Sequence, residues 1–74
     1  MSINYVAIRL SGQTITGQTE TFYDAALELR KMLRDPFYNR PDSPIKTIFL
    51  SDETTLSEYL PSEIENPANW QEGR

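Results

Sequence analysis

The chain of 74 residues contains no cysteine and no histidine. Without cysteine no disulfide can form, and without both residue types the common zinc sites, Ser-His-Asp triads and Cys-His dyads are excluded. A domain of this size gains only about 3–5 kcal/mol of net stability from its core unless something staples the fold. We therefore expect a non-enzymatic chain with no metal or cofactor, in which packing, self-association or a partner supplies stability.

Long apolar runs are also lacking, and the longest are short stretches such as residues 48–50. A membrane-spanning helix needs about 20 apolar residues, so we expect no such helix and no membrane partner. The chain does not open with a basic and then apolar segment, so we expect no secretory signal. The absence of cysteine fits a reducing compartment, and we expect a cytoplasmic location.

The net charge is −4, and the negative charge lies in the last third of the chain. Residues 1–50 carry six basic and five acidic side chains, whereas residues 51–74 carry one basic and six acidic side chains. An acidic balance argues against broad binding to nucleic-acid phosphates, so direct nucleic-acid binding is a minor hypothesis.

The first two predicted elements are strands over residues 3–10 and 13–18, joined by a turn at Ser11-Gly12 into a hairpin. Apolar and polar side chains alternate along the first strand, which indicates one buried face and one outer face. We expect the more apolar set to be buried and the other to lie outside; the first set is Val6, Ile8 and Leu10, and the second is Tyr5, Ala7 and Arg9.

A helix is predicted over residues 22–34. Thr21 with Asp24 three residues later resembles a capping box, and Asp35-Pro36 ends the helix because the residue before proline disfavours helical backbone. Its apolar residues fall at helical spacing and form one stripe, which comprises Phe22, Ala25, Ala26, Leu29, Met32 and Leu33.

A third strand is predicted over residues 45–50, followed by a short helical turn over 56–60 that Thr55 and Glu58 suggest by their capping-box spacing. Residues 61–74 are expected to be irregular, with Ile64 and Trp70 as docking points. The resulting fold is a two-layer α+β domain with a β-β-α-β core, in which one amphipathic helix lies across a three-stranded sheet. We expect residues 1–60 to form this domain and residues 61–74 to form an acidic tail.

The proline-rich loop 35–44 carries the first candidate binding residues, Phe37, Tyr38 and Arg40. Aromatic residues and arginine on a stiff loop are typical anchors at protein interfaces. The alternative is that Phe37 and Tyr38 fold back to cover a thin core, and the two interpretations have equal weight.

A second candidate set is acidic and comprises Asp52, Glu53, Glu58, Glu63 and Glu65. Carboxylates arrayed on one surface can imitate the phosphates of nucleic acid and occupy a basic groove on another protein. The simpler alternative is ordinary solubilising charge, which is favoured because the set is small.

Three functional hypotheses from different classes follow. The first is a small, acidic protein-binding module, in its sharpest form an inhibitor encoded by a phage or mobile element, like the anti-CRISPR proteins, that blocks a nucleic-acid-processing complex of the host. The second is a structural homodimer through the sheet edge or through the outer face that carries Tyr5, Ala7 and Arg9. The third is weak binding of single-stranded nucleic acid by a basic and aromatic set, which comprises Arg30, Lys31, Arg34 and Tyr38.

Overall fold

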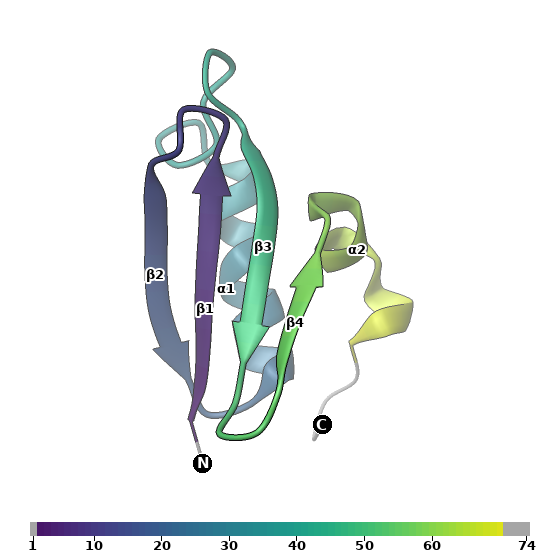
Figure 1. Ribbon diagram of the computed structural model, residues 1–74. Coiled ribbons are helices and arrows are strands. Elements are labelled where there is room, and N and C mark those ends of the chain that lie inside the picture. The colour runs from purple at the N-terminus through teal and green to yellow at the C-terminus, as the bar shows by residue number, and fades with distance from the viewer. Residues whose placement is uncertain (1, 71–74) are drawn as a thin grey trace.

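The computed structural model describes residues 2–70, and its elements form two layers (Figure 1). One layer is an antiparallel sheet of four strands in the order β2-β1-β3-β4, and the other is formed by α1, against which α2 packs. The elements in chain order are β1 (Ile3–Arg9), β2 (Thr14–Thr19), α1 (Phe22–Arg34), β3 (Ile45–Ser51), β4 (Leu56–Tyr59), α2 (Pro61–Glu65) and the 3-10 helix η1 (Pro67–Asn69). The predicted α+β class is confirmed.

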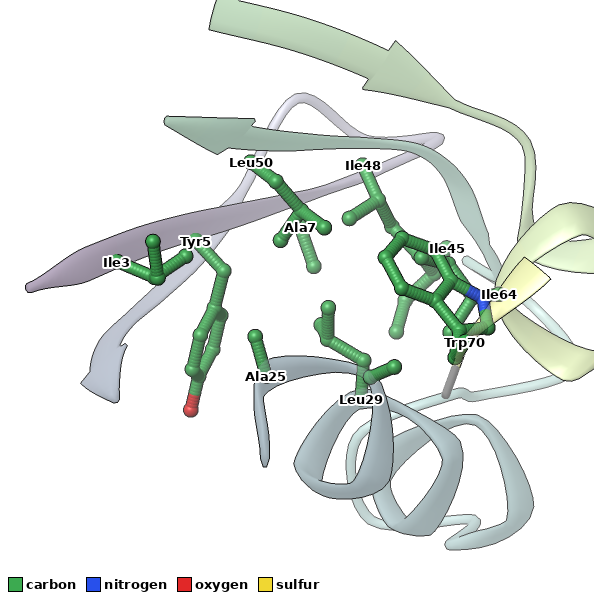
Figure 2. Close-up of a cluster of buried hydrophobic side chains, with 11 residues drawn as sticks. Ile3, Tyr5, Ala7, Ala25, Leu29, Ile45, Ile48, Leu50, Ile64 and Trp70 are labelled. Atoms are coloured by element: carbon green, nitrogen blue, oxygen red, sulfur yellow. The ribbon is translucent and has the colours of Figure 1, made fainter. Parts of the chain in front are cut away.

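The helix α1 follows its sequence prediction closely. Thr21 is the N-cap, and its side-chain oxygen accepts a hydrogen bond from the backbone N–H of Asp24 at 3.1 Å. Ala25, Ala26 and Leu29 of the apolar stripe are fully buried. Figure 2 shows Ala25 and Leu29 facing the side chains of the sheet. Two small residues on this stripe let the helix axis approach the sheet closely.

The prediction of three strands is wrong, because residues 56–59 form β4 rather than a helical turn. The cause is the turn before it. The Asp52 carboxylate accepts hydrogen bonds from the backbone N–H groups of Thr54 and Thr55, and the Asp52 N–H donates to the Thr55 carbonyl. This side-chain-stabilised turn reverses the chain, so the next residues pair with β3. Leu56 and Glu58 are exposed, in the alternation of an edge strand.

The faces of β1 are also the reverse of the prediction. Ile3, Tyr5, Ala7 and Arg9 point at α1 and are buried, whereas Val6 and Ile8 lie half-buried on the opposite face of the sheet. The physical reason is that the small Ala7 side chain leaves room for the helix, while the Arg9 guanidinium reaches acceptors on Gln13 and Phe37 at the loop end of the sheet. The number of apolar residues on each face of β1 therefore does not predict which face is buried. A homodimer interface made of Tyr5, Ala7 and Arg9 is therefore not accessible.

The segment after residue 60, predicted to be irregular, contains α2 and η1. Ile64 and Trp70 are buried, which confirms them as docking points. The Trp70 indole N–H donates to the Glu63 carbonyl at 3.0 Å, and its ring lies 5.1 Å from that of Tyr59. Figure 2 places the Trp70 ring over the end of the core near Ile45 and Ile64. Residues 61–70 thus complete the core, while residues 71–74 of the predicted acidic tail lie outside the described residues.

Candidate functional site

Loop 35–44 is held in place by its own side chains and backbone. The Asp35 carboxylate accepts from the Phe37 N–H at 2.9 Å, and the Asp35 carbonyl accepts from the N–H groups of Tyr38 and Asn39. Asn39 then links two elements, because its amide donates to the Leu33 carbonyl and accepts from the Ile45 N–H, both at 2.9 Å. The loop is therefore fixed between the end of α1 and the start of β3.

The β1–β2 hairpin supports this loop from the other side. The Leu10 N–H donates to the Pro44 carbonyl at 2.9 Å, and the Ser11 N–H donates to the Ser43 hydroxyl at 3.1 Å. Gly12 makes the hairpin possible, since it adopts a positive φ of 93° that other residues rarely tolerate. Hairpin residues 10–13 and loop 35–44 lie together at one end of the molecule, which we call the loop end (Figure 1).

Arg9 is the buried link between the two halves of the loop end. Its guanidinium donates to the Gln13 side-chain oxygen at 3.0 Å and to the Phe37 carbonyl at 3.4 Å. Arg9 is only 8% exposed, so these bonds are partly buried although Gln13 and Phe37 themselves are exposed. Sequence reasoning missed this residue because it placed Arg9 on the outer face; an arginine in a short alternating strand is a weak signal by itself.

The loop end exposes two large apolar side chains on this fixed backbone. Phe37 is 65% exposed and Leu10 is 62% exposed. The Phe37 ring meets the Tyr38 ring edge-to-face, with centroids 5.0 Å apart. Tyr38 is half-buried and Arg40 is exposed. The structure thus brings the predicted residues Phe37, Tyr38 and Arg40 together, and it leaves Phe37 outside the core.

The predicted acidic residues do not gather with them. Asp52 and Glu53 lie in the β3–β4 turn at the opposite end of the sheet (Figure 1), Glu58 lies on β4, and Glu63 and Glu65 lie on α2. The acidic set therefore lies on elements other than the loop end, namely the β3–β4 turn, β4 and α2, which follow one another in the chain.

Most of these carboxylates have structural partners inside the chain. The bonds from Thr54 and Thr55 lower the pKa of Asp52 to about 2. The Glu63 carboxylate accepts from the Leu60 N–H at 2.9 Å at the start of α2, and that of Glu65 lies 3.6 Å from the Arg34 guanidinium. Glu58 accepts from the Thr47 hydroxyl at 2.9 Å. These contacts account for the acidic residues as parts of turns, caps and pairs.

The predicted basic set is divided in the same way. Arg30 donates to the Ile64 carbonyl at 2.9 Å and Arg34 pairs with Glu65, so both face α2. Lys31 instead lines a cleft of about 320 Å³ formed by β1, α1 and loop 35–44, together with Tyr5 and Tyr38. Burial, and then the hydrogen bond and charge of Glu28, raise the pKa of Tyr5 to about 12.

Among residues 2–70, no three acidic residues lie close enough together to hold a metal ion, and no helix has the length and hydrophobicity to cross a bilayer. Comparisons of the chain with models of protein families, with curated proteins and with solved structures find no match. The loop end is a candidate site because Phe37 and Leu10 are exposed there on a backbone held by hydrogen bonds.

Proposed function

We propose that this chain is a non-enzymatic protein-binding module and that the loop end is its contact surface. The observation that carries the proposal is Phe37, which is 65% exposed although its backbone is fixed by hydrogen bonds to Asp35 and Arg9. A small domain has few large apolar groups with which to build its core. A phenylalanine kept in water on such a loop is consistent with burial in a complex.

The energetics of association favour this kind of surface. Complete burial of a phenylalanine side chain is worth about 1.5–3 kcal/mol, and most of this ring is still available for burial. A loop that is already ordered loses little conformational entropy on binding, so more of that gain appears as affinity. Leu10 extends the apolar area, and Arg40 supplies a charge at its rim.

The partner in this proposal is a larger protein, and occupation of its surface is how a small cytoplasmic inhibitor would act. The acidic residues lie on elements other than the loop end, and most of them have partners within the chain, so mimicry of nucleic-acid phosphates is not part of this proposal. The proposal therefore depends on the apolar loop end and does not depend on the acidic residues.

Site-specific photo-crosslinking tests the proposal. A benzophenone amino acid replaces Phe37 in one variant and Leu56 in a control variant; Leu56 is 68% exposed but lies on β4, away from the loop end. In lysate of the native cells, we expect one defined adduct from position 37 that is absent from position 56. Once the partner is identified, Phe37→Ala should weaken binding about tenfold to a hundredfold, in the range of interface anchors. Identical adducts from both positions, or none from position 37, would contradict the proposal.

A further inference from the structure

The edge strand β2 lacks the features with which proteins usually prevent edge-to-edge pairing. Such edges are normally short or carry a charge, a proline or a bulge. Residues 14–19 contain no charged residue and no proline, and they pair with β1 in unbroken register from Ile3–Thr19 to Ile8–Thr14. At the opposite edge of the sheet, β4 spans only four residues, carries Glu58 and is followed closely by Pro61. Of the two edges, β2 is the one open to another strand.

The hydrogen-bond pattern identifies which backbone groups of β2 are free. The Arg9 N–H donates to the Gln13 carbonyl, and bonded pairs recur at every second residue of an antiparallel ladder. The bonded pairs with β1 therefore include Ala7 with Ile15 and Tyr5 with Gly17. The N–H and C=O groups of the alternate residues, Thr14, Thr16 and Gln18, consequently point away from β1 toward solvent.

We propose that two copies of this chain associate through β2, antiparallel, about a two-fold axis at Thr16. In this register Thr16 lies opposite Thr16 of the second copy, and Thr14 lies opposite Gln18. The outward N–H and C=O groups of these three residues then all form hydrogen bonds with the second copy, because each residue stands in a hydrogen-bonded pair of the antiparallel ladder. The two sheets join into one continuous sheet with both α1 helices on the same side. Such a contact is isologous, as most homodimer interfaces are.

Side chains on both faces of β2 suit this register. On the face away from α1, the pairs are Thr16 with Thr16 and Thr14 with Gln18, which are uncharged and able to hydrogen-bond across strands. On the α1 side, Ile15 lies opposite Gly17 of the second copy. The Tyr5 ring covers Gly17 closely enough that a Cβ there would collide with it. In the dimer, the half-buried Ile15 side chain of one copy therefore contacts the Tyr5 ring of the other copy, and no gap is left at Gly17.

Charge also favours a second copy as the occupant. A charged residue on a two-fold axis faces its own like charge, and β2 has none. Beside β2, a cleft of about 340 Å³ is lined toward the start of α1 by Glu20, Asp24 and Glu28 and further along the helix by Lys31. The two-fold axis makes the α1 helices of the two copies run in opposite directions. Lys31 of each copy therefore lies on the same side of the dimer as the carboxylates of the other copy.

A single introduced cysteine tests the register, because the chain has no other thiol. Opposite residues in a bonded antiparallel pair have Cα atoms about 5.5 Å apart, within the usual range for a disulfide. We expect Thr16→Cys to form a covalent dimer under mild oxidation. Thr14→Cys is the matched control: its two copies would lie about 14 Å apart along the strands, so it should stay monomeric. Equal crosslinking of both variants, or none at position 16, would overturn the proposal.

The mass in solution provides a second test. We expect the unmodified chain to show twice its mass of 8.5 kDa by light scattering at high concentration. Thr16→Lys should shift it to the monomer mass by placing two like charges on the axis, whereas Leu56→Lys on β4 should leave the dimer intact. If the wild-type chain is a monomer at all concentrations, the proposal is refuted. This holds even if β2 is then found to bind an extended basic peptide in place of a second copy. Phe37→Ala should not change the mass, so the result does not depend on the proposed function of the loop end.

Discussion

Gly17 is the position at which the packing of the core can be tested most directly. It lies opposite Tyr5 in the β1–β2 ladder, and the Tyr5 ring lies across it. A Cβ added to Gly17 would be 2.7 Å from Cε2 of Tyr5 and closer still to Cζ and Oη. Its φ is not positive, so alanine meets no backbone strain there. Gly17→Ala therefore isolates the steric conflict with the ring.

Two opposing terms set the expected effect. Overfilling a packed site costs about 1–3 kcal/mol when side chains are forced from their preferred positions. Replacement of glycine by alanine at a compatible site recovers about 0.4–1 kcal/mol by restricting the unfolded chain. Tyr5 is only 4% exposed, but it lines an open cleft toward which its ring can shift, so we expect a net loss of about 1–2 kcal/mol. For a domain of this size that lowers Tm by about 5–15 °C.

The assay is a double-mutant cycle of Gly17→Ala and Tyr5→Leu, followed by thermal and urea unfolding. In the Tyr5→Leu background the ring is absent, so the same alanine should be neutral or stabilising by about 0.4–1 kcal/mol. All four proteins are compared at one concentration, since self-association makes Tm depend on concentration. If Gly17→Ala is as stable as wild type while Tyr5 is present, the reasoning is wrong.

Two further predictions concern buried polar groups. Arg9→Met should lower the free energy of unfolding, measured in urea, by about 1–3 kcal/mol, because the Gln13 side chain and the Phe37 carbonyl lose a charged donor. The control is Arg40→Met at an exposed position, which should change that free energy by less than about 0.5 kcal/mol. Equal effects of the two substitutions would contradict the role of Arg9. Between pH 10 and pH 12 the unfolded chain loses the Tyr5 proton while the folded chain keeps it, so stability should fall by about 2–3 kcal/mol as pH rises. Tyr5→Phe should lose this component of the decline, and parallel pH profiles for the two proteins would show that the hydroxyl is not buried as described.

The binding candidates were recognised from sequence to different degrees. Phe37 was identified because it lies on a loop rich in proline, but its exposure could not be predicted, since a core aromatic has the same local sequence. Its exposure follows from Asp35 and Asn39, whose side chains bond to backbone groups up to six residues away. The acidic residues were grouped because they are close in sequence. The fold distributes them over the β3–β4 turn, β4 and α2 and gives most of them hydrogen-bond or ion-pair partners within the chain.

Local signals were sufficient for α1, whose cap, apolar stripe and terminating proline agree with one another. The same reasoning failed at β4, where Thr55 and Glu58 have the spacing of a capping box but the Asp52 carboxylate binds the backbone N–H groups of Thr54 and Thr55 in a turn. A turn and a helix start use the same residue types, and only pairing with β3 distinguishes them. Strand pairing is a long-range contact, so a short local pattern does not contain it.

By itself, the amino-acid sequence determined the class of the fold, the bounds of the helix and the absence of thiol and imidazole chemistry, because composition and short-range periodicity are properties of neighbouring residues. Only the tertiary structure decided which face of β1 is buried, that Arg9 is inside, that residues 61–69 form α2 and η1, and that β2 is an edge strand. Each of these depends on which segments meet in space. That choice is made by the packing of the whole chain, through small differences between large opposing free energies, and not by any one segment.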